Sequence, residues 1–323
     1  MTVWFVRGLP DDNMMKAWLD KEGKVKFSTG GSINMHWKVA HHYKLYVVKT
    51  PIPKQPPSLI VNELSSPETH ADALKSCLRI CNHFKRPVIN HPAKILQTTR
   101  DKVAKNLAGI ANLIVPPTFV CNPKSPDEVL EFAEKHQLGD SVIIRETGTH
   151  GGETMVRFNG RADYALLHQL AYDGRDFYMS SFVDYQSSDG LYRKLRIVNI
   201  GNEIRPRHCL ITDKWMVHAA AREFMDNHPK VNEEETHYMQ NFEQETRPKL
   251  EPIFAEMRRR LGLDYFGADC HLYPDGRVLL FEANANMNVT ENTGVDKGVA
   301  EPYIARIVGD FRGLIDRRLK GKR

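Results

Sequence analysis

The sequence lacks the features that mark several large classes of protein. It contains five cysteines, an odd number, and no C-x-x-C pair, which argues against a disulfide framework or a zinc knuckle and favours a reducing compartment. No apolar run approaches the ~18 residues needed to span a bilayer. The first residues, MTVWFVRGLPDD, are too charged for the hydrophobic region of a signal peptide. We therefore expect a soluble, cytoplasmic protein that does not bind membranes.

A strong charge of one sign is also missing. The 323 residues carry a formal charge of +5, and Lys and Arg are spread along the chain. Only the final stretch, RRLKGKR, is rich in basic residues, and a solvated helix end explains it better than contact with nucleic acid does. There is no P-loop, dinucleotide-binding fingerprint or G-x-S-x-G motif. We therefore expect no nucleic-acid partner, and a hydrolase has little support.

The remaining composition is that of a globular α/β protein. Hydrophobic residues make up 41% of the chain and charged residues 26%, and the length suggests about two domains. Strand-like and helix-like patterns alternate, which predicts a small N-terminal α/β domain over residues 1–92. We expect two further segments, over residues 93–177 and 178–323.

The strongest local signals predict individual elements. Ser66-Pro67 predicts the start of a helix, and Ser125-Pro-Asp-Glu128 is a capping box that begins another. A Gly-rich stretch over 146–153 lies between two strand-like segments and predicts a hairpin-like flap. The other expected elements are strands over 3–6, 45–48, 59–61, 87–89, 142–145, 154–158, 178–184, 195–200 and 205–208, a hairpin over 266–284, and helices over 100–112, 233–261 and 301–319.

An unusual polar stretch follows an apolar strand near the C-terminus. Residues 281–288 read FEANANMN, and side chains two apart on a strand share a face. Glu282, Asn284 and Asn286 are therefore predicted to form a row of oxygen donors. Such a row is costly to bury unless a cation lies beside it.

The preceding turn predicts which residues face this row. Tyr273–Val278 reads YPDGRV, a strong signal for a tight turn between two strands. A two-residue and a four-residue turn both place Asp269 directly opposite Glu282, and Gly267 opposite Asn284.

Two facing carboxylates need a shared proton or a shared cation, because like charges directly opposite each other destabilise a sheet. Carboxylate and amide oxygens are the ligands that Mg²⁺ prefers. We therefore expect Asp269, Glu282 and Asn284 to hold Mg²⁺. The alternative is a solvated polar face, with a slipped register that separates the two acids.

These residues resemble the metal-binding end of the ATP-grasp superfamily. The resemblance rests on LDYFGAD (263–269), the turn, and LFEAN (280–284), and it is nearest to the branch of glutathione synthetase and the ribosomal-protein glutamyl ligases. The D-alanine–D-alanine ligases are more distant. The resemblance implies an α+β ATP-grasp architecture, in which a pre-ATP-grasp domain precedes two subdomains that clasp ATP. It also implies two Mg²⁺ ions held by Asp269, Glu282 and Asn284.

The resemblance also assigns nucleotide-binding residues. It implies a phosphate-binding lysine in the entry segment, a second phosphate-binding cation at the end of a strand, a mobile glycine flap, and a hinge strand that contacts adenine. The lysine is Lys102 and the strand-end cation is Arg145. The flap contains Gly148, His150, Gly151 and Gly152, and Phe182 and Val183 of the hinge strand contact adenine. The ribose-binding acid is either Asp184 or Asp189. Each of the first three groups also has a plainer explanation. Lys102 could be a surface lysine and Arg145 a strand-end arginine. The glycines could form a flexible hairpin tip, with His150 as a solvated loop histidine.

The sequence departs from the family at two places. Arg145 stands where a lysine is usual, and arginine keeps its proton but can bind phosphate through two nitrogens. Ala285–Asn288 replaces the usual Pro-Gly, which affects the substrate side more than the metal.

The implied reaction activates a carboxylate with the γ-phosphate of ATP and passes the acyl phosphate to an amine. Phosphoryl transfer needs positioning and charge neutralisation more than covalent catalysis, and Arg196 is expected to hold the transferred group. We expect Arg207 and His208 to face an anionic substrate or the acyl phosphate, although a solvated sheet face explains them equally well. They belong to a basic set between the hinge and the metal strands: Arg193, Lys194, Arg196, Arg205, Arg207, His208, His218 and Arg222.

The leading hypothesis is an ATP- and Mg²⁺-dependent carboxylate–amine ligase that acts on small-molecule or peptide substrates. A small-molecule kinase on the same fold is the second hypothesis, and a nucleotide-binding regulatory module is the third. The intact Asp269, Glu282 and Asn284 argue against the third. Release of ADP that depends on an amine favours the ligase, and a stable phosphorylated product favours the kinase. Related ligases often form dimers, so a homodimer is one expectation.

Overall fold

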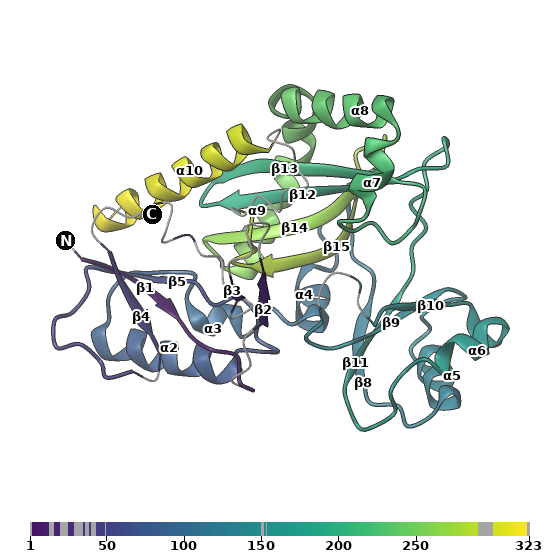
Figure 1. Ribbon diagram of the computed structural model, residues 1–323, viewed down its shortest axis with the longest axis horizontal. Helices are drawn as coiled ribbons and strands as arrows, with labels where there is room; N and C mark the ends of the chain where they lie inside the picture. Colours follow the sequence, from purple (N-terminus) through teal and green to yellow (C-terminus); the bar gives the residue numbers. More distant parts are fainter. Residues whose placement is uncertain are drawn as a thin grey trace.

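The computed structural model describes residues 2–12, 16–19, 25–28, 35, 39, 43–48, 50–149, 152, 154–289 and 300–321. It has α/β architecture with three principal sheets, which confirms the predicted fold class. Figure 1 shows the N-terminal sheet at lower left, a small antiparallel sheet at lower right, and a five-stranded sheet above them. A separate two-stranded antiparallel ribbon consists of β2 (Lys16–Leu19) and β3 (Val25–Ser28).

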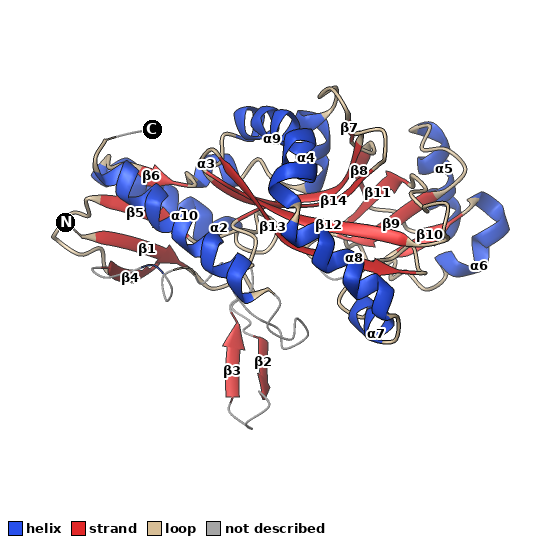
Figure 2. Ribbon diagram, turned by 90° about the horizontal axis from the view of Figure 1, so that it is seen from above, coloured by secondary structure: helices blue, strands red, loops and turns tan. Residues whose placement is uncertain are grey.

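The N-terminal sheet consists of β1 (Val3–Arg7), β4 (Tyr43–Val47), β5 (Leu59–Asn62) and β6 (Val88–Ile89), with α2 (Ala71–Phe84) and α10 (Glu301–Leu319) packed on it. It is parallel, in the order β4-β1-β5-β6. Successive strand residues point to opposite faces, so Trp4 packs in the cluster with α2 while Phe5 packs in the cluster with α10. The C-terminal helix lies along this sheet (Figure 2) and also contacts the five-stranded sheet. The predicted boundaries at residues 92 and 177 stay a prediction.

The small antiparallel sheet has the order β10-β9-β11-β8. Its strands are β8 (Thr118–Cys121), β9 (Val142–Glu146), β10 (Val156–Phe158) and β11 (Phe177–Ser181), and the short helices α5 (Pro126–Lys135), η1 (Gly160–Asp163) and α6 (Tyr164–Leu167) accompany it. One face is buried in a cluster with α5 and α6 that includes Val142, Ile144 and Phe177. The opposite face is left for the site described below.

The five-stranded sheet has the order β13-β12-β14-β15-β7. Its strands are β7 (Leu113–Ile114), β12 (Tyr192–Ile200), β13 (Glu203–Thr212), β14 (Tyr265–Leu272) and β15 (Val278–Ala285). The remaining helices are α3 (Pro92–Ile95), α4 (Arg100–Leu107), α7 (Ala221–Asp226), α8 (Pro229–Gln240), η2 (Phe242–Thr246) and α9 (Arg247–Leu261). Phe254 of α9 stacks on Phe266 of β14 at 6.1 Å between ring centroids. Because side chains alternate along β14, Asp269 points to the face away from α9.

Three expected helices differ from the structure, and the one expected over 100–112 ends earlier, at Leu107. The helix expected at Ser66-Pro67 begins at Ala71, because Ser66 closes a turn instead: its carbonyl accepts a hydrogen bond from the His70 N–H at 3.0 Å. The single helix expected over 233–261 is two helices, α8 and α9, joined by the π-helical turn η2. The break lies at Asn241, the C-cap of α8, whose side chain donates to the His237 carbonyl at 2.9 Å.

The tip of the metal-strand hairpin has neither of the two predicted lengths, because its loop is one residue longer than the two-residue turn and one residue shorter than the four-residue turn. The Tyr273 N–H donates to the Arg277 carbonyl at 2.8 Å, which closes a three-residue loop. Gly276 in this loop has φ +88°, a conformation that favours glycine. Near the tip, Cys270 therefore pairs with Leu280.

A bulge in β15 restores the predicted register at the site. The shift lies between Asp269 and Cys270 on β14, so Phe281 is the extra residue on β15. Beyond the bulge, Asp269 pairs with Glu282 and Gly267 pairs with Asn284. The predicted facing of the two acids is confirmed, although the turn used to predict it was wrong by one residue.

Asn286 does not continue the row of oxygen donors. It follows the end of β15 with φ +49°, is 2% exposed, and donates to the carbonyls of Asn62 at 2.9 Å and Leu64 at 2.7 Å. The left-handed backbone conformation turns the side chain away from the face of Glu282 and towards the N-terminal sheet. The prediction of a three-residue row was therefore wrong at its third member.

The five cysteines are all buried and free. Among the residues that the structure describes, no helix is both long and apolar enough to cross a membrane.

Candidate functional site

A cavity of about 460 Å³ lies between the small antiparallel sheet and the five-stranded sheet. Ile143, Tyr178 and Ser180 line it from the first sheet, and Leu280 from the second. Within the described part of the chain, its wall includes two carboxylates, Asp269 and Glu282, and six cationic side chains. These cations are Arg100, Arg145, Lys194, Arg196, Arg207 and Arg222.

The two facing carboxylates each have their own cation. Asp269, which is 2% exposed, accepts hydrogen bonds from Arg196 Nε at 2.7 Å and Nη2 at 2.8 Å, and Lys194 Nζ lies 3.3 Å away. Glu282 accepts a hydrogen bond from Arg100 at 2.5 Å.

These cations keep both acids ionised. Burial by itself raises the pKa of Asp269, but Arg196 and Lys194 outweigh it and hold that pKa well below its usual range. Burial and the charge of Asp269 raise the pKa of Glu282, and Arg100 turns the net shift of that pKa downward. The facing acids are therefore stable as a pair of carboxylates without a shared proton.

The donor set fits magnesium and leaves room on the ion for further oxygen ligands. Asp269 and Glu282 supply hard anionic oxygens from adjacent strands, and Asn284 adds an amide oxygen at the same cavity wall. Among the described residues, no group of three or more His, Cys, Asp or Glu side chains gathers as a metal site. Two acids and one amide leave coordination positions for the oxygens of a nucleotide.

Arg145 provides an independent sign of an anion. Burial, followed by the nearby charge of Arg100, lowers the pKa of Arg145 to about 10. Its Nη2 donates to the Thr149 carbonyl at 2.5 Å, but its buried Nε has no hydrogen-bond partner among the described residues. A buried guanidinium with an unused donor costs free energy unless a ligand accepts that hydrogen bond. A phosphate in the cavity fits this requirement.

The structure brings most of the predicted site residues together. Those that line the cavity are Arg145, Gly152, Phe182, Val183, Arg196, Arg207, His208, Asp269, Glu282 and Asn284. His150 and Gly151 lie outside the described residues. Gly148 is not part of the wall and packs beside Glu68 and Thr69 instead.

Three predicted nucleotide-binding residues lie elsewhere. Lys102 donates to the Leu96 carbonyl at 3.2 Å on the exposed side of α4. Asp189 pairs with Arg193 at 2.7 Å. Asp184 accepts a hydrogen bond from the backbone N–H two residues further on, at 3.1 Å. Neither candidate for the ribose-binding acid lines the cavity.

Arg100 occupies the position expected for Lys102. Two residues apart on a helix point roughly 200° away from each other, so Arg100 faces Glu282 while Lys102 faces outward. Lys194 was named in the predicted basic set but was not assigned to the site, although it is two residues before Arg196 on the same strand. That alternation was the available signal. The other residues of the wall that were missed include Tyr178, Trp215 and Met216.

A second bulge explains why Arg207 and His208 both line the cavity. Adjacent strand residues normally point to opposite faces. Here Arg196 pairs with His208 and Ile197 pairs with Pro206, so Arg207 is an extra residue between them. Arg207 is 4% exposed, and its Nε donates to the Val289 carbonyl at 2.9 Å.

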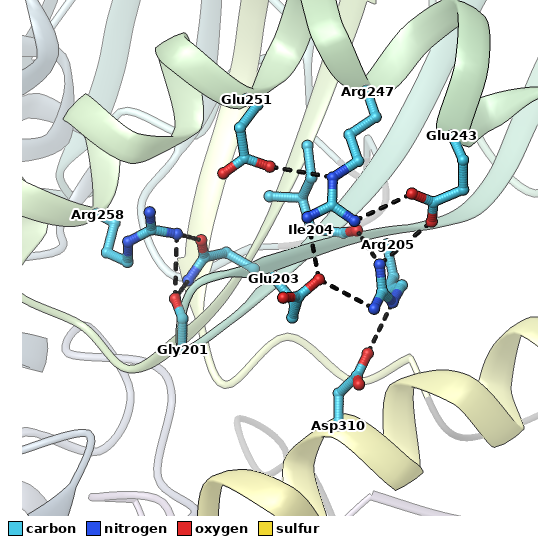
Figure 3. Close-up of polar contacts among 10 residues, drawn as sticks. Gly201, Glu203, Ile204, Arg205, Glu243, Arg247, Glu251, Arg258 and Asp310 are labelled. Carbon is cyan, nitrogen blue, oxygen red and sulfur yellow. Dashed lines mark hydrogen bonds and ion pairs between the residues drawn. The ribbon is translucent and has the colours of Figure 1, made fainter. Parts of the chain in front are cut away.

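Two members of the predicted basic set point away from the cavity. Arg193 lies on the opposite face of β12 and pairs with Asp189 and Glu234. Arg205 belongs to an ion-pair network on the outer side of β13 (Figure 3), where it contacts Asp310 of α10 at 2.7 Å and Glu243 of η2 at 3.2 Å. Arg205 therefore joins β13 to two helices and does not form a cleft wall.

His208 predicts a measurable pH dependence of stability. Burial, and then the charge of Arg196, lowers the pKa of His208 well below its ordinary 6.5. As pH falls below 6.5, the unfolded chain takes up a proton that the folded site excludes, so stability decreases. We expect the free energy of unfolding to fall by up to about 1.4 kcal/mol per pH unit more in the parent than in His208→Gln. Urea denaturation at several pH values measures this difference, and equal slopes would contradict it.

Comparisons with known proteins bear on the fold of the chain. No protein-family model matches the sequence, and no curated protein matches it significantly. The ATP-grasp ligase PsnB, in a structure complexed with a phosphomimetic variant of its minimal precursor, Mg and ADP, is 13% identical with a TM-score of 0.54, and the match covers 98% of each chain. The D-cycloserine synthetase DcsG is 13% identical with a TM-score of 0.53, covering 99% of this chain and 100% of the other.

A third solved structure is the D-alanine–D-alanine ligase from Bacillus anthracis complexed with ATP. It is 9% identical, with a TM-score of 0.53, and the match covers 100% of this chain and 99% of the other. At these identities the similarity shows a shared fold over nearly the whole chain.

Proposed function

We propose that this chain, which has the ATP-grasp fold, is an ATP- and Mg²⁺-dependent ligase that activates a carboxylate as an acyl phosphate and joins it to an amine. One observation carries the proposal. Asp269 and Glu282 face each other across two strands, with Asn284 beside them, in a cavity whose wall is otherwise strongly cationic. Two acids among six cations suit a metal-bound polyphosphate better than a neutral ligand.

Asp269, Glu282 and Asn284 are the residues that would hold magnesium. When bound, Mg²⁺ supplies charge neutralisation on the phosphates. Arg145, with its unused buried Nε, is placed to donate to a phosphate oxygen. Arg196 and Arg100 bond to the two acids, so both would lie beside the phosphates of a nucleotide held there.

The apolar part of the cavity suits the base of the nucleotide. Phe182 and Val183 follow β11, and the Trp215 ring packs edge-on against Phe182 with 5.5 Å between the ring centroids. Arg157 stacks on the same phenyl ring, 3.7 Å from its centroid. This packing fixes Phe182 in the wall, and a flat aromatic base gains by stacking in such a pocket.

Arg207 and His208 are proposed to bind the carboxylate substrate. Both line the cavity next to Arg196, on the adjacent strand. His208 is neutral there because its pKa is lowered, so its ring can offer a hydrogen bond without adding charge. A cationic wall favours an anionic acyl donor, and either a peptide or a small molecule satisfies that requirement.

A screen of ADP release tests the proposal. Purified protein with Mg²⁺ and ATP is offered pairs of amino acids and short peptides, and release of ADP is measured with and without the amine. We expect release to require a carboxylate and to rise with the amine, and hydroxylamine to trap a hydroxamate. A stable phosphorylated product in place of the hydroxamate would indicate a kinase.

Mg²⁺ and ATP are expected to stabilise the protein together but not separately. Magnesium alone must displace arginines from both acids, and ATP alone brings phosphates towards two carboxylates. When both are present, magnesium pairs with the carboxylates and the arginines pair with the phosphates. A ligand at 100 times its dissociation constant stabilises the folded protein by about 2.7 kcal/mol. We expect a rise in melting temperature of roughly 5 °C with both ligands, reversed by EDTA. Full stabilisation by ATP in EDTA would contradict this exchange.

A further inference from the structure

We propose that Asn62, Asn90 and Asn286 are positioning residues that fix the end of β15, and with it Asn284 and Arg207, against the N-terminal domain. We refer to these three residues as the asparagine cluster. The proposal rests on the proposed function, because it assigns the cluster an effect on magnesium–nucleotide binding. None of the three lines the cavity, so any effect must act through other residues.

The cluster is buried, and its amide groups are bonded to the backbone of separate segments. Asn62 and Asn90 are 0% exposed, and Asn286 is 2% exposed. The Asn90 side chain accepts from the Asp264 N–H at 2.8 Å and the Tyr265 N–H at 2.9 Å. It donates to the Tyr265 carbonyl at 2.6 Å and to Asn286 Oδ1 at 2.5 Å. Asn90 therefore joins the start of β14 to the end of β15.

Asn62 and Asn286 extend the same connections into the N-terminal sheet. Asn286 Nδ2 donates to the carbonyls of Asn62, the last residue of β5, and Leu64, two residues further on. Asn62 Nδ2 donates to the Asn90 carbonyl at 3.1 Å, and its Oδ1 accepts from the Leu64 N–H at 3.1 Å. Buried amide groups with partners of this kind are costly to separate. The N-terminal domain and the metal strands therefore have one preferred relative position.

The residues just after the cluster connect it to the substrate side. Tyr265 Oη donates to the Met287 carbonyl at 2.9 Å, and Arg207 Nε donates to the Val289 carbonyl. Met287 crosses directly over Gly267, where an added Cβ would lie 2.4 Å from the methionine sulfur. Asn284 pairs with that same Gly267. A shift of Asn286 must therefore move both a proposed metal ligand and the arginine proposed to bind substrate.

Calorimetry with magnesium and the non-hydrolysable analogue AMPPNP tests the cluster. Asn286→Gly removes the side chain while allowing the left-handed backbone conformation, and Asn62→Ala removes the contacts from the N-terminal side. We expect the dissociation constant to rise at least tenfold in Asn286→Gly and at least threefold in Asn62→Ala. In the ligand-free protein, hydrogen exchange at the Asp264 and Tyr265 amides is expected to be at least tenfold faster in Asn286→Gly.

Asn199→Ala is the matched control. Asn199 is also 0% exposed, and its side chain bonds to the Gly201 carbonyl at 3.2 Å and to Arg258 at 2.9 Å. It lies on the α9 side of β12, away from the cavity, so we expect lower thermal stability with an unchanged dissociation constant. Equal weakening by Asn199→Ala, or folded cluster variants with affinity within twofold of the parent, would overturn the proposal.

Two further outcomes are distinguishable. If both cluster variants fail to fold while Asn199→Ala folds, the cluster determines folding and not site geometry, and the proposal is wrong. If the parent itself does not bind Mg²⁺ and AMPPNP, the proposed function fails. The exchange rates of the ligand-free protein then still show whether the cluster couples the two domains.

Discussion

Glu282→Gln is expected to lower Mg²⁺-dependent turnover by at least 1,000-fold, which corresponds to about 4 kcal/mol in the activation barrier. The substitution keeps the size of the side chain and removes the charge that faces Asp269 across the hairpin. Without it, the site has one carboxylate to hold a divalent cation, and Arg100 loses its partner at 2.5 Å. Steady-state ADP release measures the change.

The hairpin itself offers a matched control for Glu282→Gln. Asp275→Asn removes an equal charge from the tip of the same two strands, where Asp275 pairs only with the exposed Arg277 among the described residues. We expect turnover within twofold of the parent in this variant. Activity of Glu282→Gln within tenfold of the parent, in a protein with a normal melting transition, would remove Glu282 from the metal site.

Arg196→Gln is expected to reduce kcat by about 10² to 10³, the range found when one preorganised donor to a developing charge is removed. Arg196 holds Asp269 through two hydrogen bonds and lies between Lys194 and His208 at the cavity wall. Because we propose that it binds the transferred phosphoryl group, the loss should appear in kcat more than in the KM for ATP. Single-turnover measurements separate the two effects.

Arg193→Gln tests whether the loss of kcat depends on which face of β12 the arginine occupies. Arg193 is on the same strand β12 but points to the other face, where it pairs with Glu234 at 2.5 Å. We expect a small change in stability and no change in kcat. A kcat for Arg196→Gln equal to that of Arg193→Gln would show that Arg196 has no part in the reaction.

Much of the site could be predicted because its residues are close in sequence on one hairpin. Once a tight turn was recognised, the two-residue period of a strand brought Asp269 and Glu282 face to face. The detail of the turn was wrong, yet the bulge at Phe281 compensated for it. Bulges depend on packing with neighbouring strands, and no local pattern signals them.

Cation partners were harder to predict because they come from distant segments. Arg100 reaches Glu282 across 182 residues of sequence, and the choice between Arg100 and Lys102 depends on how α4 is rotated against the sheet. Basic residues on β12 and β13 could be recognised as a set. The bulge at Arg207 determines which of these basic residues face the cavity. Helices cover the other side of the sheet, where Arg205 lies (Figure 3).

Local periodicity and turn chemistry are enough to predict the alternation of strands and helices, the acidic hairpin and the facing of its two carboxylates. The packed fold was needed to show which cations hold those acids, that Asn286 leaves the row to join the asparagine cluster, and that Lys102, Asp184 and Asp189 lie off the cavity wall. Buried charges and amides must find partners wherever the packed chain supplies them. Those partners lie on segments that only the fold brings together.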